Sequence, residues 1–385
     1  MTTIFAPSDE QFLSRAVDLA ENGLFSTSPN PHVGCLIRRN GRTIAEGWHK
    51  RTGLAHAEAM ALQQLQKNGK NAAGAEVFIN LEPCSHHGLT PPCVSALVAA
   101  KPARVIVAMP DPNPQVTGKS LHILRQAGVL VSMTSPKSAV FLRALELNIG
   151  FMSRHIRRRP WLRLKIAATL DGKTALADGQ SRWISNEASR LDAHRLRARS
   201  CAILTGIGTV LQDNPALTVR HVATFRQPLR ILADSKLKAR ADMKIFADNN
   251  VLIATAQSEK DAKKRFPDAA VLTLPNNEKK VDFELLMKAL ADKGINEVTA
   301  EAGRKINGAL LAAGLVDEIV LYVAARVFGD TGLDMLVSPS PSSPADARHF
   351  ELHDVSRLPA DNLKIVYRAP AALSEILKYI KERFD

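Results

Sequence analysis

The sequence predicts an α/β protein with two domains, and three observations support this. The chain has 385 residues, which is more than the ~100–200 residues of a typical single domain. Hydrophobic residues make up 45% of it and are interleaved with charges, as in ordinary globular proteins. Strand and helix patterns alternate along both halves, which predicts crossover connections and mostly parallel sheets.

The first half opens on an amphipathic run at residues 12–24, preceded by Ser8 and Gln11 in an S-x-x-Q capping box, which predicts a helix. The runs VGCLIRR and TIAEGW flank the pair Asn40-Gly41, so a hairpin with a two-residue turn should follow. Further elements are expected as a helix over 57–68, a strand at EVFINL, a helix after Pro92 and a strand at RVIVAM.

An arginine-rich stretch, FMSRHIRRRPW at residues 151–161, interrupts this alternation. A solvated linker explains one isolated basic cluster better than a nucleic-acid patch does. We therefore expect domains at residues 1–150 and 161–385, joined by a linker at 151–160.

The second half repeats the alternation of strands and helices. Strands are expected at RLKIAATLDG, CAILTGIG, LRILAD, NVLIATA, EVTAEAG and IVLYVAA, and helices over 188–199, 283–293 and 306–313. The tail AALSEILKYIKERFD has helical spacing and should form a closing helix.

Composition narrows the possible partners and compartment. No apolar run approaches the ~18 residues of a membrane span, and the N-terminus does not look like a secretory signal, so a cytoplasmic location is expected. The net charge of +13 indicates an anionic partner. Aromatic residues make up only 5%, which weakens a single-stranded nucleic-acid interpretation.

Two of the four cysteines stand beside prolines and histidines rather than in apolar runs. Cys35 and Cys201 lie in strand-like segments and should be core residues. In contrast, Cys84 and Cys93 follow a predicted strand, downstream of His56. One imidazole and two thiolates form a zinc-type ligand set, and three protein ligands leave the fourth position to water, as a catalytic site requires.

Glu58 completes this pattern, because the sequence His56-Ala57-Glu58 puts a carboxylate next to the metal ligand. Such a glutamate can take a proton from water and return it to a departing amine, as in zinc deaminases. The alternative is a closed structural site in which His86 or His87 supplies a fourth ligand.

These motifs, LAHAEAMAL and LEPCSHHGLTPPC, resemble the bifunctional deaminase/reductase family of bacterial riboflavin biosynthesis, within the cytidine-deaminase-like superfamily. Eight residues, SHHGLTPP, separate the cysteines, in place of the common P-C-x-x-C spacing, and this argues against tRNA-adenosine and cytidine deaminases. In NPHVG, the resemblance implies that Asn30 holds the pyrimidine ring, although a simple turn is an alternative. It also implies that His49, His86 and His87 line the deaminase pocket. The alternative is that they are exposed loop histidines.

The second half is similar to the reductase domain of the same family at KIAATLDGKTA, SRWIS, LTGIGTVLQDNPALTVR, LADS and AEAGRKINGALL. The resemblance implies a cytidine-deaminase-like α/β/α domain followed by a dihydrofolate-reductase-like α/β domain that uses NADPH. The implied substrate contacts are Lys165, Arg197, Asp213, Leu217, Arg220 and Glu301. The implied NADPH contacts are Ala167, Ser181, Trp183, Thr209, Asp213, Ser235, Gly303, Arg304, Lys305, Ile306, Asn307, Gly308 and Ala309.

The residues alone support this second site less strongly. Gly303 lies between a predicted strand and a helix, where backbone N–H groups suit a pyrophosphate, but the segment lacks G-x-G-x-x-G. A tight turn explains Gly206-Ile207-Gly208 as well as a nucleotide site does. Surface solvation likewise explains any single arginine without a phosphate contact. Asp171, in an Asp-Gly turn, shapes its loop.

The resemblance implies two reactions in sequence. Zn²⁺-dependent deamination would convert 2,5-diamino-6-(5-phosphoribosylamino)pyrimidin-4(3H)-one to the uracil, and NADPH would reduce the ribosyl group to give 5-amino-6-(5-phosphoribitylamino)uracil. These anionic ligands account for the basic charge, so we expect no nucleic-acid or membrane partner, and a homo-oligomer through the reductase domain. Two alternative functions remain: a nucleic-acid base deaminase, and a non-catalytic zinc protein whose second half is an assembly domain.

Overall fold

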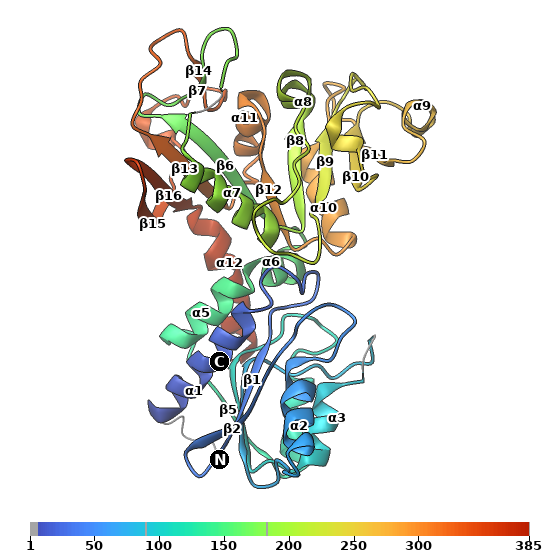
Figure 1. Ribbon diagram of the computed structural model, residues 1–385, viewed down its shortest axis with the longest axis vertical. Helices are drawn as coiled ribbons and strands as arrows, with labels where there is room; N and C mark the ends of the chain where they lie inside the picture. Colours follow the sequence, from blue (N-terminus) through green and yellow to red (C-terminus); the bar gives the residue numbers. More distant parts are fainter. Residues whose placement is uncertain (1–6, 89–90, 182–183, 385) are drawn as a thin grey trace. The chain divides into compact units, whose positions relative to one another are not determined.

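The computed structural model describes residues 7–88, 91–181 and 184–384, and these form two compact units (Figure 1). One unit contains the chain up to Arg157 together with the segment from Ile376 onward, and the other spans Arg158–Glu375. The linker predicted at residues 151–160 overlaps helix α6 (Ile149–Arg157), so most of this segment is helical. Its apolar side chains are buried and its basic residues lie in the last turn, so this is an amphipathic helix.

The first unit is a three-layer α/β/α structure around a five-stranded sheet in the order β2-β1-β3-β4-β5. Strand β1 is antiparallel to β2 and β3, whereas β3, β4 and β5 run parallel. The strands are β1 (Gly34–Arg39), β2 (Arg42–Trp48), β3 (Glu76–Leu81), β4 (Arg104–Met109) and β5 (Leu130–Met133). The remaining helices are α1 (Pro7–Glu21), α2 (Ala57–Lys67), α3 (Cys93–Ala100), α4 (Lys119–Gln126) and α5 (Ala139–Leu147).

Helices α2, α3 and α4 pack on one face of this sheet, and α1 and α5 contact its strands from the other (Figure 1). The predicted turn is confirmed, since Asn40 and Gly41 both have positive φ, at 50° and 73°. The predicted start of the first helix is wrong. Helix α1 begins at Pro7, so Ser8 lies within the helix and does not precede it.

The second unit is built on a nine-stranded sheet in the order β11-β10-β9-β8-β12-β6-β13-β16-β15. The neighbouring strands β11, β10, β9, β8, β12, β6 and β13 are all parallel, as predicted. An antiparallel β15–β16 hairpin extends the sheet beyond β13. The strands are β6 (Trp161–Thr169), β8 (Ala202–Gly206), β9 (Leu229–Ala233), β10 (Val251–Thr255), β11 (Ala270–Thr273), β12 (Glu297–Ala300), β13 (Glu318–Ala324), β15 (Glu351–Leu358) and β16 (Asn362–Arg368). A two-stranded ribbon of β7 (Lys173–Ala175) and β14 (Leu333–Asp334) lies apart from it.

Helices cover both faces of this sheet. The helices are α7 (Glu187–Arg199), α8 (Ile207–Asp213), α9 (Glu259–Arg265), α10 (Phe283–Asp292) and α11 (Arg304–Ala312). Helix α12 (Pro370–Phe384) begins in this unit, but from Ile376 onward it belongs to the first unit and not to the domain predicted at residues 161–385. Helices α10 and α11 pack with alternate strand residues in one core, and α8 and α9 pack in the core on the opposite face. Short turns after β8 and β12 lead directly into α8 and α11, at the edge where parallel α/β sheets bind ligands.

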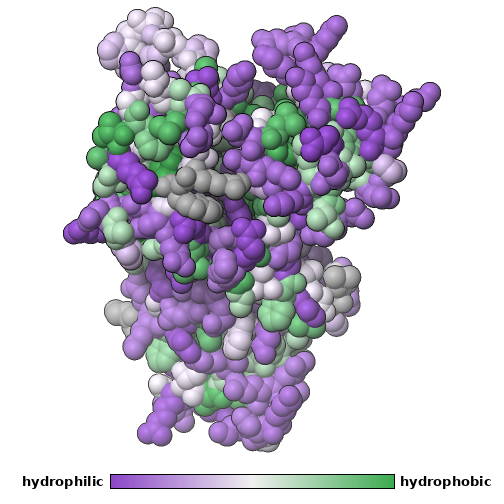
Figure 2. Space-filling view, turned by 45° about the horizontal axis from the view of Figure 1, so that its top comes forward, coloured by the Kyte–Doolittle hydropathy of each residue, from purple (hydrophilic) through white to green (hydrophobic). Residues whose placement is uncertain are grey.

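The described surface is mainly polar. Figure 2 shows a face on which hydrophilic residues predominate and hydrophobic ones form separate groups. Within the described residues, no helix is both long enough and apolar enough to cross a membrane. Cys35 and Cys201 are buried, as predicted for core residues.

Candidate active sites

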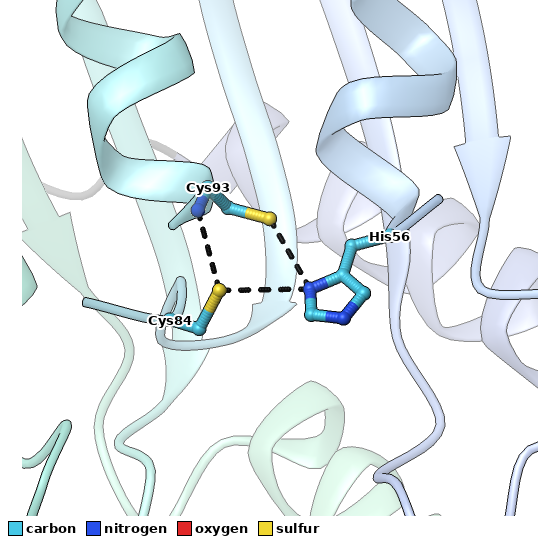
Figure 3. A group of neighbouring side chains, drawn as sticks. All are labelled: His56, Cys84 and Cys93. Carbon is cyan, nitrogen blue, oxygen red and sulfur yellow. Dashed lines mark hydrogen bonds between the residues drawn. The ribbon is translucent and has the colours of Figure 1, made fainter. Parts of the chain in front are cut away.

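Three side chains from separate elements of the first unit converge on one point (Figure 3). His56 caps the start of α2, Cys93 opens α3, and Cys84 lies in the loop between β3 and α3. His56 Nδ1 lies 3.5 Å from Cys84 Sγ and 3.3 Å from Cys93 Sγ, and all three donor atoms lie within 4.8 Å of one another. A tetrahedral zinc ion with ordinary Zn–N and Zn–S bonds would separate such N and S atoms by about 3.6 Å. The spacing therefore fits zinc.

The two thiols affect each other's protonation. A hydrogen bond from Cys93 lowers the pKa of the Cys84 thiol to about 4, whereas that bond and burial raise the pKa of Cys93. Without a metal, the pair thus keeps one proton between its two sulfur atoms. A divalent cation is the partner that lets both become thiolates.

The closed-site alternative does not fit this geometry. His86 is half-buried and His87 exposed, and the only metal-binding group among the described residues consists of His56, Cys84 and Cys93. His86 Nδ1 is buried without a hydrogen bond to any described residue. The loop histidines therefore supply no fourth ligand, and the site has the open position that catalysis needs.

Glu58 lies in the first turn of α2, two residues beyond His56, and its side chain is buried. Burial and the negative charge of Cys84 raise the pKa of Glu58, and a hydrogen bond from Cys93 opposes that rise. The carboxylate therefore lies against the metal ligands, as predicted. A raised pKa lets a buried carboxylate hold a proton closer to neutral pH than an exposed one does, which suits general acid–base catalysis.

His49 and Asn30 lie beside this cluster. The His49 and His56 rings meet edge to face with centroids 4.9 Å apart. Asn30 Nδ2 donates to His49 Nε2 at 3.1 Å, so His49 donates through Nδ1 to the Ala55 carbonyl. Burial lowers the pKa of His49, and the imidazole is neutral. The structure therefore brings Asn30, His49 and His56 together, while the substrate contacts of Asn30 and His49 remain predictions.

Two residues that the sequence analysis missed hold the loop that carries Asn30. Asn80, in the middle of the apolar strand β3, accepts from Gly34 N and donates to His32 O. Asn148 accepts from His32 N and also donates to His32 O. A buried asparagine in the run EVFINL was the available signal, because such an amide needs partners.

Asn148→Asp is expected to raise the KM for deamination about tenfold and to lower stability by about 1–3 kcal/mol. The substitution keeps the acceptor for His32 N but loses the donor to His32 O, and it buries a negative charge. Zinc content should stay at the wild-type level, because none of the three ligands lies in this loop. Ammonia-release kinetics and metal analysis test this, and an unchanged KM would rule out a positioning role for the amide.

In the second unit, three of the predicted substrate residues meet at the end of β12. Arg197 Nη2 donates to Glu301 Oε2 at 2.9 Å, and Lys165 Nζ lies 4.0 Å from the same oxygen. Burial by itself would raise the pKa of Glu301, but Arg197 and Lys165 hold it at about 2. Burial also lowers the pKa of Lys165. An ionised carboxylate thus fixes two cations in a half-buried group.

The sequence analysis also missed one neighbour of Lys165, Tyr322, and the two residues linked to it, Asp192 and Lys364. The Tyr322 ring lies 5.7 Å from Lys165 Nζ, and its hydroxyl donates to Asp192 at 2.6 Å. Lys364 pairs with the same aspartate at 2.8 Å. Tyr322 was hidden in the strand pattern IVLYVAA, because apolar periodicity does not distinguish a tyrosine at a site from one in a core.

The remaining predicted substrate residues lie beyond α8. Asp213 ends this helix and is half-buried, Leu217 is buried with a φ of 53°, and Arg220 is exposed. Arg197 Nη1 donates to Thr218 O at 3.1 Å, which ties this segment to the Glu301 group.

The predicted cofactor residues divide into two sets. Gly303 and Thr209 are adjacent, since a Cβ on Gly303 would lie 3.6 Å from Thr209 Oγ1, and Ile306 packs against Gly206. Ala167, Ser181, Arg304, Lys305 and Ala309 are half-buried or exposed. In contrast, Asn307 is buried and donates to Met335 O, and a Cβ on Gly308 would clash with the Val337 backbone.

Two further cofactor predictions need comment. Ser235 is half-buried after β9, and its hydroxyl accepts from Val281 N. Trp183 lies outside the described residues. Asn307 and Gly308 hold the segment at 335–337, so their side of α11 faces protein, and the cofactor roles of all these residues remain predictions.

Comparison with known proteins defines the class. A model of the cytidine and deoxycytidylate deaminase zinc-binding region matches residues 6–109, and a model of the RibD C-terminal domain matches residues 160–364. A zinc deaminase unit followed by this reductase-type unit defines a bifunctional deaminase/reductase. The chain belongs to the RibD family of riboflavin biosynthesis, and the predicted family, fold class and enzyme class are confirmed.

Similarity extends over nearly the whole chain. Riboflavin biosynthesis protein RibD of Escherichia coli (strain K12) is 40% identical over 365 residues, which cover 92% of this chain and 97% of that protein. The RibD structure of Acinetobacter baumannii has a TM-score of 0.85 at 35% identity and covers 94% of this chain and 98% of its own. A deaminase/reductase structure from Thermotoga maritima has a TM-score of 0.84 at 31% identity, covering 94% and 99%.

Proposed function

We propose that this chain deaminates 2,5-diamino-6-(5-phosphoribosylamino)pyrimidin-4(3H)-one in its first unit and reduces the resulting ribosyl group to ribityl in its second. The observation that carries this proposal is the three-atom group of His56, Cys84 and Cys93 beside the buried Glu58. Its position in a chain with a RibD-type second unit supports the phosphorylated pyrimidine as substrate.

For the first reaction, His56, Cys84 and Cys93 would hold Zn²⁺, which supplies an activated water at neutral pH when bound. Glu58 would accept a proton from this water and deliver it to the departing amine. Asn30 would hold the pyrimidine ring, with its amide oriented by the neutral His49. His86 would approach the phosphorylated end of the substrate.

For the second reaction, NADPH would bind near Thr209 of α8 and Gly303 before α11, and it would supply hydride. The hydride would add to C1′ of the sugar in its opened, imine form, and the imine nitrogen would take up a proton. Lys165, which lies beside Glu301, would provide that proton, and Arg220 would bind the phosphate.

A direct test incubates zinc-loaded protein with the diaminopyrimidine phosphate, with and without NADPH. We expect ammonia release under both conditions, and loss of nicotinamide absorbance only when NADPH and the substrate are both present. Ammonia without NADPH oxidation would overturn the reductase half. Turnover of a polynucleotide, with salt-sensitive binding, would instead favour a nucleic-acid base deaminase.

We also propose that two copies associate through the reductase unit. In the described chain β15 is an edge strand of the nine-stranded sheet, with Leu352 and Val355 60% and 56% exposed. The backbone donors and acceptors on the outer side of such an edge strand pair readily with a second copy. The reduced thiols of the zinc site and the use of NADPH fit a cytoplasmic location.

Val355→Pro is expected to weaken this association at least tenfold, because proline removes a backbone donor from the edge. Sedimentation across a concentration series measures the effect. The control is Leu170→Ala. Leu170 is also exposed but does not lie in the edge strand β15, so this variant should leave association unchanged. A wild-type chain that sediments as a monomer at all concentrations would refute the oligomer.

A further inference from the structure

The segment Leu217–His221 of the second unit has an unusual backbone. It belongs to no helix or strand, and Leu217 and His221 have positive φ values of 53° and 64°. Leu217 and Val219 are nevertheless buried. Because a buried segment without sheet pairing needs other partners for its backbone groups, side chains must supply them.

Side chains from both flanks bind this segment one residue after another. Gln227 accepts from Val219 N at 2.7 Å and donates to Val219 O at 3.2 Å. Arg197, on α7, holds the carbonyl of Thr218. The next residue, Arg220, is held by α7 as well, through His194.

His194 lies one turn before Arg197 on α7 and is 7% exposed. Its Nδ1 accepts a hydrogen bond from Arg220 N at 3.1 Å, so Nδ1 carries no proton. Burial lowers the pKa of His194 to about 4, and the charges of Arg197 and Arg220 act in the same direction, against the opposing charge of Glu301. The ring is therefore a neutral acceptor at physiological pH.

We propose that His194 is a positioning residue of the reductase: its bond to the Arg220 backbone aims the Arg220 guanidinium at the phosphate of the substrate. This inference rests on the proposed function, which gives Arg220 its phosphate. The hydrogen bond to the Arg220 amide fixes the backbone from which the Arg220 side chain extends. A fixed backbone reduces the conformational freedom that phosphate binding must remove.

The chemistry of this position favours histidine over other acceptors. A carboxylate would also accept from Arg220 N, but its charge would compete with phosphate for Arg197 and Arg220. A lysine or arginine offers no acceptor. Neutral imidazole accepts the bond without adding a negative charge, so the positive charge of the exposed Arg220 stays available for an anion.

Three variants separate the acceptor from the ring. His194→Asn keeps an acceptor on the γ carbon, where Nδ1 is attached, but removes the ring. His194→Phe keeps the ring and removes the acceptor, and His194→Gln moves the acceptor one bond further along the side chain. If the bond to Arg220 N matters, Asn should rescue function while Phe and Gln should not.

The measurement is steady-state NADPH oxidation with the deaminated, phosphorylated substrate. We expect His194→Phe to raise its KM about tenfold with little change in kcat, and His194→Asn to stay near wild type. With the dephosphorylated substrate the variants should not differ. Adding His194→Phe to Arg220→Ala should cause no further loss, because the position of the Arg220 backbone no longer matters once the guanidinium is gone.

A binding experiment keeps this inference separate from the reductase proposal. Ribose 5-phosphate, titrated calorimetrically into each variant, should bind about tenfold more weakly to His194→Phe than to His194→Asn. If the wild-type protein never oxidised NADPH but the Phe and Asn variants still differed in binding, the reduction step would be rejected and the positioning role of His194 retained. Equal binding and equal KM in the Phe and Asn variants would overturn the role of His194, whether or not wild type is active.

Discussion

Glu58→Gln is expected to lower the rate of ammonia release by about 10²–10⁴-fold, the usual contribution of a general acid–base. Glutamine has nearly the same size and still fills the buried position, but it cannot accept the proton of water or return one to the amine. His56, Cys84 and Cys93 are unchanged, so the variant should bind zinc as the wild type does. Stopped assays for ammonia, with metal content measured on the same samples, give the result.

Two controls make this prediction specific. Glu76→Gln removes another carboxylate of the first unit, one that pairs with Arg38 and Arg104, and should leave ammonia release near wild type at permissive temperature. NADPH oxidation with the deaminated substrate should be the same in both variants. Deamination that survives Glu58→Gln with zinc bound would support a different proton carrier and a non-catalytic role for Glu58.

The zinc site could be predicted from the sequence because its residues fall in short, chemically distinctive motifs. His56 and Glu58 are separated by one residue, and each cysteine stands next to a proline. The supporting contacts could not be predicted in the same way. Asn148 reaches His32 across 116 residues of chain, and only the packing of α5 and α6 against the sheet brings the two together.

The second unit shows the same limit. The alternation of strand and helix segments along the chain predicted its parallel strands. Each strand could be recognised because a strand buried on both faces is a continuous apolar run. The β15–β16 hairpin was missed, since β15 is mostly exposed and its sequence ELHDVSRL has no apolar face. Asn307 and Gly308 followed the family pattern, but their contacts with Met335 and Val337 depend on how a distant loop returns to α11.

The pH dependence of the second unit follows from two carboxylates at the ends of β12. Burial by itself would raise the pKa of Glu297 and Glu301, but paired arginines hold both at about 2, below the ordinary 4.5. Because the folded pKa is lowered, the ion pairs stabilise the unit above about pH 5. That stability is lost as the pH falls from about 4.5 toward 2, whereas it does not change between pH 6 and 8.

Glu301→Gln is expected to reduce NADPH oxidation by about 100-fold and to lower the free energy of unfolding by about 3–5 kcal/mol. The change leaves Arg197 and Lys165 in a half-buried site without a counter-charge, and Lys165 loses the carboxylate that holds its ammonium near the sugar. Steady-state kinetics at low temperature, together with denaturant unfolding, measure the two effects separately.

Glu297→Gln is the matched control, because Glu297 lies at the other end of the same strand. It pairs with Arg163 and Arg199 and is more deeply buried than Glu301, yet it contacts none of the predicted substrate residues in the Glu301 group. Both variants should therefore lose similar stability, but only Glu301→Gln should lose activity once both are folded. Equal losses of activity would mean that the reductase depends on the overall stability of β12, and the catalytic placement of Lys165 by Glu301 would be wrong.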